Sequence, residues 1–590
     1  MLIPPRSWYG HAMVAALLFC ITMILAGGTV TAEEARYGPF WEGTFQAPDD
    51  HTGLGPEADQ LIESLLDRMT PAERVAQLLM VSWTTEAPTP EILRWIRDRN
   101  IGGVKIFGWN GENISVLASA IRDMQTESLR TRLSIPLFTA TDQEGGWVRH
   151  IKDGTSITPG NMAIGATGLP YDAYMSAHHI GLELRALGVN LNFAPTVDVY
   201  INPEAHVIGP RAFSDNPVTT GLLGVAYFRG LDQTGVMATA KHFPGHGNAR
   251  GDSHGMLPVI HDDFDTVWNR DLLPFRMLVR EGVPAILSGH LSFPEITGDN
   301  VPASISPYFK QHVLRDRLGF QGIVITDDLY MGGALEYGQS QGWDFAELVK
   351  RAIEAGNDIV MLSQTPEFDG PIWNRLITSY TDDAAFRDRV NESVRRILRV
   401  KLTYLRPDNR VPLIPDVERI RTFMRSLPAQ EFFFDQAGRS VTVIRNGNIP
   451  YTPQPDERIL LAGQDMDFIR VGKRYFPDAG VFRFTNPAFY FSSAVDRNTF
   501  AATARNYDTV VFLVSDPNSV EVLQTVRDMD VQVIVYSILT PVYLADLRWV
   551  HSALAVYGWG VDSFETGFAA LRGDFVPAGQ LPIGLDGGGR

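Results

Sequence analysis

The 590-residue sequence has a single cysteine, Cys20, which lies in an apolar stretch near the amino terminus. A mature chain without that stretch could form no disulfide and would have no thiol nucleophile. Positive charge is also scarce, because 51 Lys and Arg face 68 Asp and Glu, and no basic run is dense enough to hold nucleic acid. The net charge of −17 suits a protein that acts on neutral or weakly charged substrates.

Residues 1–32 are predicted to form an export signal. Arg6 precedes the uncharged apolar residues 12–26, and residues 30–32, Val-Thr-Ala, resemble a cleavage site. The alternative is an uncleaved membrane anchor, because the charge-free residues 11–32 approach the ~20 residues that span a bilayer. Both interpretations predict an exported protein, periplasmic or extracellular.

The chain is longer than the roughly 250–300 residues at which single cores stop growing, so two domains are expected. Between about residues 70 and 365, short apolar runs alternate with stretches of helical period. The eight runs are 77–83, 103–108, 136–142, 190–199, 236–242, 285–293, 322–328 and 358–363. This pattern predicts a catalytic (β/α)8 TIM-like barrel over residues 33–405.

A smaller α/β sandwich domain is predicted to follow at residues 429–590, after a proline-rich polar linker at 406–428. It should begin with a helix near 429–441 and contain strands at 441–445, 459–462, 509–514 and 531–538. No glycine-rich phosphate-binding motif occurs in it, so a nucleotide cofactor has no support.

Polar residues cluster where four of the barrel strands are predicted to end. These ends are residues 142–146, 241–242, 288–290 and 326–328. Barrel enzymes place their catalytic groups at the carboxyl ends of the strands, so we expect these residues to share one pocket.

Asp252 and His254 lie in a glycine-rich segment that cannot form a regular helix, and residues two apart in an extended stretch point to the same side. A carboxylate bonded to one ring nitrogen fixes the imidazole tautomer and leaves the other nitrogen free to transfer protons. Alternatives are a histidine that braces the loop, or a zinc site, although the spacing matches no standard zinc pattern.

The apolar run at 322–328 ends in Asp327 and Asp328, which should point to opposite sides of the strand. One of them could be a nucleophile, while the other bonds the strand end or caps the next helix. A carboxylate and a proton-transferring group from different strand ends match glycoside hydrolysis with retention. The second role, usually taken by a carboxylate, would fall to His254.

These motifs resemble glycoside hydrolase family 3, specifically its β-N-acetylglucosaminidase branch. The motifs are residues 142–146, 192–199, 207–213, 241–247, 252–254, 325–329 and 579–583. The resemblance implies that Asp327 is the nucleophile and that His254, assisted by Asp252, is the acid/base. It also implies contacts to sugar hydroxyls, and no metal or cofactor. The implied contacts come from Asp142, Arg211, Lys241 and His242.

One departure concerns the strand-three motif. The family usually has an arginine eight residues after Asp142, whereas this chain has His150 there, Arg149 one residue earlier and Trp147 where another arginine is common. We therefore expect Arg149 and His150 to be sugar contacts that differ from the family pattern.

The expected function is a retaining exo-β-N-acetylhexosaminidase that releases terminal GlcNAc from peptidoglycan fragments or chitooligosaccharides through a glycosyl-aspartate intermediate. The family's glucosidases and xylosidases lack the Asp-Ser-His element of residues 252–254, which favours N-acetylhexosamine over glucose. A phosphorylase is an alternative, because a neutral imidazole repels phosphate less than a carboxylate does. A sugar-binding protein with a decayed site is another. The expected partner is a carbohydrate, and the oligomeric state is open.

Overall fold

The computed structural model describes residues 38–42, 55–406, 410–484 and 493–585. The predicted export signal, residues 1–32 with Cys20, lies outside the described residues. Within the described ranges, none of the helices combines the length and the apolar character needed to cross a bilayer.

Eight parallel strands form a barrel, and each lies within one of the eight predicted apolar runs. In chain order they are β1 (Leu79–Val81), β2 (Gly103–Ile106), β3 (Phe138–Thr141), β6 (Leu191–Asn192), β7 (Met237–Phe243), β8 (Ala285–Ser288), β9 (Ile323–Thr326) and β10 (Val360–Leu362). Neighbours in the chain are neighbours in the sheet, and a bridge between Ile325 and Ile359 joins the last strand to β9. The predicted barrel is therefore confirmed.

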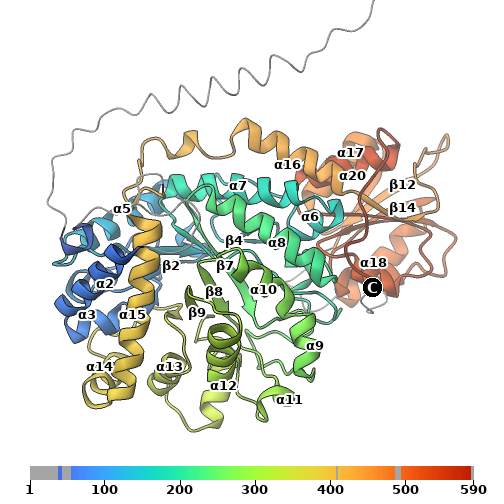
Figure 1. Cartoon of the computed structure of the whole chain (residues 1–590). Helices are drawn as coiled ribbons and strands as arrows, with labels where there is room; N and C mark the ends of the chain where they lie inside the picture. The colour runs from blue at the N-terminus through green and yellow to red at the C-terminus, as the bar shows by residue number, and fades with distance from the viewer. Residues whose placement is uncertain (1–37, 43–54, 407–409, 485–492, 586–590) are drawn as a thin grey trace, which may run out of the picture.

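Helices surround these strands (Figure 1). The longer ones are α2 (Pro56–Arg68), α4 (Pro90–Arg99), α5 (Ile114–Leu129), α7 (Pro170–Leu187), α8 (Pro217–Asp232), α10 (Leu272–Arg280), α12 (Gly332–Ser340), α13 (Phe345–Glu354), α14 (Pro371–Asp382) and α15 (Ala384–Leu405). Helix α13 shows why such segments are helical. Asp344 accepts a hydrogen bond from the Glu347 amide as an N-cap, and Leu348, Ala352 and Ile353 recur at helical spacing on a buried face.

The second domain is built on a six-stranded sheet with the order β11-β16-β15-β14-β12-β13. The strands are β11 (Thr442–Asn446), β12 (Ile459–Gly463), β13 (Gly480–Arg483), β14 (Thr509–Val514), β15 (Gln532–Ile538) and β16 (Ser552–Tyr557). Alternate residues of β14 enter two apolar cores, so that Val511 packs on one face and Phe512 on the other. This is the predicted α/β sandwich, although the sequence analysis missed β13 and β16.

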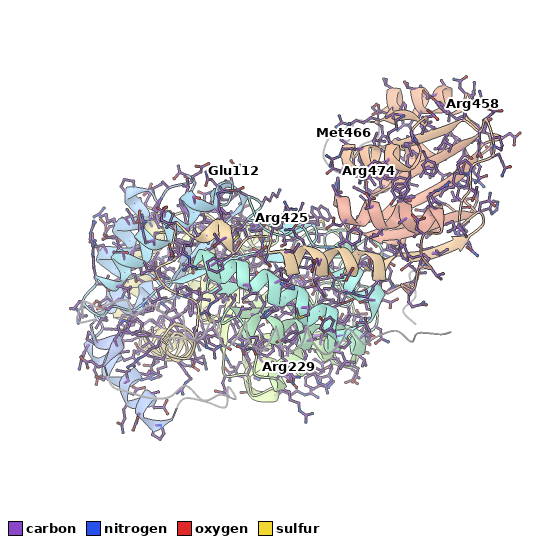
Figure 2. All side chains as sticks on the ribbon, turned by 90° about the horizontal axis from the view of Figure 1, so that it is seen from above. Glu112, Arg229, Arg425, Arg458, Met466 and Arg474 are labelled. Atoms are coloured by element: carbon purple, nitrogen blue, oxygen red, sulfur yellow. The ribbon has the colours of Figure 1, made fainter. Side chains whose placement is uncertain are left out.

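Five helices cover the two faces of that sheet. They are α16 (Leu427–Ser440), α17 (Met466–Tyr475), α18 (Ala494–Ala504), α19 (Pro517–Gln524) and α20 (Val561–Arg572). Helix α16 also packs against α7 and the short α6 (Asn161–Thr167), so it runs from the barrel to the second domain (Figure 1). In Figure 2 the second domain, marked by Arg458 and Arg474, extends from one end of the barrel, on which Arg229 is labelled.

Apolar side chains and backbone hydrogen bonds join the two domains. Met162 and Tyr200 of the barrel share a buried cluster with Val542 and Tyr557 of the second domain. Near the carboxyl terminus, the Ser214 hydroxyl donates to the Pro582 carbonyl. The barrel loops at the carboxyl ends of the strands therefore stand against the second domain.

Candidate active site

A cavity of about 270 Å³ opens at the carboxyl ends of the barrel strands. Its ionisable lining residues are Lys105, Asp142, His150, Arg211, Lys241, His242, His254, Asp327 and Asp328. The structure thus brings together seven of the nine predicted site residues from strands and loops far apart in the chain. An eighth, Asp252, contacts His254 from the adjoining wall.

Asp327 follows β9 and is oriented by its backbone, because its amide donates to the Ser288 carbonyl (2.9 Å). Burial on its own would raise the pKa of the Asp327 carboxyl, but the nearby His242, His290 and His254 outweigh burial and the net pKa is lowered. Asp327 is therefore ionised near neutral pH, as a nucleophile must be.

Asp328 points elsewhere and braces the strand ends. Its Oδ1 accepts from the amides of Tyr330 (3.2 Å) and Ser363 (3.0 Å), and its carbonyl accepts from His290 Nε2 (2.9 Å). Burial raises the pKa of the Asp328 carboxyl. Of the two adjacent acids, only Asp327 combines an ionised carboxylate with a place facing the proton-transfer pair.

A chain of ion pairs forms the opposite wall of the cavity. Lys241 Nζ lies 2.5 Å from Asp142 Oδ1 and 2.5 Å from Glu144 Oε1. Arg211 binds Glu144 through two bonds, Nε to Oε2 (3.0 Å) and Nη2 to Oε1 (2.8 Å). Burial opposes ionisation of Glu144, but Arg211 and Lys241 lower its pKa to about 2. The planar pairing fixes these side chains before a sugar arrives.

The hydrogen bonds of His242 define its tautomer. Arg211 Nη2 can only donate, so His242 Nε2, 2.9 Å away, is the acceptor. The proton therefore resides on Nδ1, which donates to Asp198 Oδ2 (2.7 Å). The buried Asp198 also accepts from the amides of His242 (3.2 Å) and His246 (2.7 Å), so one carboxylate organises this whole segment.

His254 and Asp252 form the predicted proton-transfer pair. His254 Nδ1 donates to Asp252 Oδ1 (2.6 Å), and the His254 amide donates to the same oxygen (3.0 Å). The hydrogen bond to Asp252 raises the pKa of His254. The free Nε2 is available for proton transfer, and 64% of the His254 side chain is exposed, which lets it meet a substrate.

The loop that carries His254 is attached to the start of α12. The amides of Gly332 and Gly333 donate to the carbonyls of His254 (2.9 Å) and Ser253 (3.0 Å). A Cβ at Gly332 would lie 2.7 Å from the Gly255 carbonyl carbon, so the close approach depends on glycine there. His246 supports the loop from below, because its Nε2 lies 3.2 Å from Ser253 Oγ.

Two predicted sugar contacts have different fates. His150 lines the cavity, and burial followed by the charge of Lys105 lowers its pKa to about 4, so its ring is neutral. Arg149 faces the other way and donates to the carbonyls of Thr155 (3.2 Å) and Ser156 (2.9 Å). Adjacent residues of an extended segment point to opposite sides, which is why only one of the two reaches the cavity.

The sequence analysis missed Lys105, Glu144 and Asp198 as parts of the site. Lys105 is fully buried on β2, and its Nζ bonds Asp142 Oδ2 and lies 3.4 Å from His150 Nδ1. A lysine inside an otherwise apolar strand was a usable signal, because lysine is almost never fully buried without a partner. Glu144 and Asp198 lay within quoted motifs, but their buried partners come from distant segments.

The geometry can now be compared with known proteins. The sequence model of the glycosyl hydrolase family 3 N-terminal domain matches residues 70–400, more than half of the chain. A stretch of 292 residues is 38% identical to β-hexosaminidase A of Pseudoalteromonas piscicida and covers 46% of this chain and 47% of that protein. A stretch of 285 residues is 36% identical to the β-hexosaminidase of Methylobacillus flagellatus and covers 47% of this chain and 78% of that protein.

A solved structure extends the similarity beyond the barrel. The glycoside hydrolase family 3 β-N-acetylglucosaminidase from Paenibacillus sp. str. FPU-7 superposes with a TM-score of 0.76 at 25% identity, covering 88% of this chain and 99% of that one. The matched sequence, in contrast, spans about half the length of the Pseudoalteromonas relative. The family match over the barrel, together with the two-domain fold and the site at the strand ends, leads to one conclusion: the chain belongs to glycoside hydrolase family 3.

Proposed function

We propose that this protein is a retaining exo-β-N-acetylhexosaminidase that removes a terminal β-linked GlcNAc. The observation that carries the proposal is the Asp252–His254 pair, which stands at the same cavity as the ionised Asp327. The two relatives named β-hexosaminidase and the family 3 β-N-acetylglucosaminidase structure support the same substrate class.

In the first step, an oxygen of Asp327 attacks the anomeric carbon and the glycosidic C–O bond breaks. The electron pair of that bond passes to the leaving oxygen, which takes a proton from His254 Nε2. In the second step, His254 takes a proton from water while the water oxygen attacks the anomeric carbon. The Asp327 carboxylate is then released, and Asp252 stabilises the imidazolium in both steps.

The ion-paired wall holds the sugar for this chemistry. Asp142 accepts and Lys241 and Arg211 donate, so together they match hydroxyls that both give and receive hydrogen bonds. The cavity of about 270 Å³ is smaller than the roughly 300–1,000 Å³ of sites for drug-sized ligands, so it suits one sugar unit. A one-unit cavity explains release from the chain end.

The test uses the full chain and an aryl β-N-acetylglucosaminide, with the GalNAc and glucose analogues measured in parallel. Asp327→Ala should abolish turnover while leaving the thermal unfolding midpoint close to that of the parent. A 5-fluoro GlcNAc donor should label Asp327, as read by peptide mass, and NMR should show the β-anomer as first product. Normal turnover of Asp327→Ala, or an α-product, would refute the assignment.

A phosphorylase is the second candidate, and one observation favours it. The acid/base is an imidazole that is 64% exposed rather than a carboxylate, so an incoming phosphate meets less repulsion. Incubation with and without phosphate separates the two, because a phosphorylase yields GlcNAc 1-phosphate and a hydrolase yields GlcNAc in both tubes.

We also propose that the chain is exported. The support is the apolar composition of residues 12–26 and the small residues 30–32. Fractionation of cells expressing the full chain should place the activity outside the cytoplasm, either released or held on the membrane. Deletion of residues 2–32 should return the activity to the cytoplasmic fraction.

A further inference from the structure

A second cavity, of about 360 Å³, lies between the barrel loops and the second domain. It is continuous with the catalytic cavity, because Trp147 and Val207 line both. Its barrel wall comprises Trp147, Glu204, His206, Val207, Pro210, Gly251 and Asp252, and its second-domain wall comprises Ser515, Asp516, Pro517, Leu539, Thr540 and Tyr543. We call it the interdomain cavity.

The proton-transfer pair stands on the boundary of the two cavities. His254 lines the catalytic cavity, whereas its partner Asp252 lines the interdomain cavity. A general acid must face the oxygen that leaves, so the leaving group lies on the side of the sugar where this pair stands. We propose, resting on the function proposed above, that the interdomain cavity binds the leaving-group sugar and selects an uncharged N-acetylhexosamine over an anionic muramic acid unit.

The charge of the lining carries the selectivity. Among the described residues that line the interdomain cavity there are three carboxylates and no Lys or Arg. A protonated His254 balances Asp252, which leaves Glu204 and Asp516 as net negative charge. Burial lowers the pKa of His206, so its imidazole is neutral near pH 7 and adds no positive charge. A carboxylate on the leaving sugar would meet like charge.

The negative charge at Asp516 is held in place by the second domain. Asp516 is the N-cap of α19, and its Oδ1 accepts from the Ser519 amide (2.8 Å). Its Oδ2 accepts from the Ser515 hydroxyl (3.0 Å) and from Gln464 Nε2 (3.3 Å). These bonds prevent the carboxylate from turning away from an incoming group, so the second domain fixes part of the specificity.

Aromatic faces supply the binding surface for a neutral ring. Trp147 is 38% exposed where the two cavities meet, and Tyr543 packs against His206 with ring centroids 6.2 Å apart. The C–H face of a pyranose gains from burial against such surfaces. Trp147 also stands where the family commonly has an arginine, so this chain has an apolar surface in place of a cation that an anionic sugar would pair with.

The groove continues beyond one leaving sugar. A further cavity of about 760 Å³ shares Glu204, His206, Pro517 and Tyr543 with the interdomain cavity. It adds two carboxylates, Glu521 and Asp546, and one cation, Arg548, so the lining stays acidic. A neutral oligosaccharide can therefore extend from the catalytic cavity along the seam between the domains.

The test compares two disaccharides that differ only at the leaving sugar. N,N′-diacetylchitobiose has a GlcNAc leaving unit, and GlcNAc-β-1,4-MurNAc carries an added lactyl carboxylate on that unit. At low ionic strength we expect kcat/KM to be about tenfold or more higher for chitobiose, the effect of one like-charge contact at a partly solvated site. Salt at 0.5 M should narrow the ratio.

A double variant, Glu204→Gln with Asp516→Asn, tests the cause of the selectivity. Asn remains a good N-cap, so α19 should persist while two charges are lost. The chitobiose-to-muramyl ratio should fall at least about threefold, since part of the like-charge contact is removed. The matched control is Asp67→Asn on α2, an exposed acid at the end of the barrel away from the second domain (Figure 1), which should leave the ratio unchanged.

An aryl β-N-acetylglucosaminide separates failure of this inference from failure of the proposed function. If the aryl substrate is hydrolysed but the two disaccharides react at equal rates, the interdomain cavity does not select by charge. A higher rate on the muramyl disaccharide would likewise overturn the inference. If the parent chain hydrolyses none of the three substrates, the proposed function itself fails.

Discussion

Gly332 is the position where a single methyl group should uncouple proton transfer from nucleophilic attack. It begins α12, just after the strand that carries Asp327, and its amide donates to the His254 carbonyl. In Gly332→Ala the new Cβ would lie 2.7 Å from the Gly255 carbonyl carbon and 2.9 Å from the His254 carbonyl oxygen. The two backbones must therefore separate.

The size of the separation follows from these distances. Ordinary carbon contacts begin near 3.4 Å, so the loop must retreat from α12 by about 0.7 Å. A displacement of about 1 Å in a catalytic group can lower a rate on the order of a hundredfold. We therefore expect kcat/KM for N,N′-diacetylchitobiose to fall roughly tenfold to a hundredfold in Gly332→Ala.

The assay compares two leaving groups. The sugar leaving group of chitobiose needs a proton from His254, whereas 4-nitrophenolate departs as a stabilised anion and needs little help. The 4-nitrophenyl β-N-acetylglucosaminide rate should therefore fall less. The control is Gly438→Ala in α16, where the nearest atom would be Thr566 Cγ2 at 3.6 Å. That variant should keep both rates and gain up to about 1 kcal/mol of stability from helix propensity.

Equal losses on both substrates would refute the reasoning, because they would place the damage at Asp327 or in the fold rather than in the loop. Unchanged chitobiose turnover with an unchanged thermal midpoint would also refute it, since the loop position would then be irrelevant to proton transfer.

Three further predictions concern charge. Because the hydrogen bond from Asp252 raises the pKa of His254, Asp252→Asn should move the alkaline limb of the kcat/KM profile for chitobiose to lower pH, and an unmoved limb would contradict the pairing. Lys105→Met should raise the inhibition constant of free GlcNAc about tenfold to a hundredfold, the value of a charged hydrogen bond, if Lys105 and Asp142 hold the sugar together. Burial lowers the pKa of His246 to about 4, below the unfolded value of about 6.5, so the neutral ring stabilises the fold above pH 6.5 and that stability is lost as the pH falls toward 4. Urea unfolding at pH 7 and pH 4.5 should show a loss on the order of 3 kcal/mol that is smaller in His246→Asn, whereas an identical loss in the variant would exclude this histidine as the cause.

Much of the fold was predictable because parallel strands of a barrel are buried on both faces and read as short apolar runs. Each of the eight predicted runs contains one strand, and the polar residues after them do meet in one cavity. In the second domain, β13 was missed because Gly480 and Arg483 dilute a four-residue strand. The sequence Ser552–Tyr557 of β16 contains two alanines and gave a similarly weak β signal.

The site was less predictable wherever it depends on partners distant in the chain. The orientation of Arg149 was settled by carbonyls at Thr155 and Ser156 that no local pattern announces. The position of Asp198 beneath His242 joins residues 44 apart. Local spacing predicted the Asp252–His254 contact because those residues are only two apart, and a strand end predicted Asp327.

The interdomain cavity has a consequence for partial unfolding. Its two walls come from chain segments about three hundred residues apart, and they meet only while the second domain is docked through clusters such as that of Tyr200 and Val542. The catalytic cavity, in contrast, is lined by barrel residues alone. Mild heat or denaturant that loosens the docking should therefore produce an enzyme that still cleaves aryl glycosides yet no longer distinguishes leaving sugars, so selectivity should fail before turnover does.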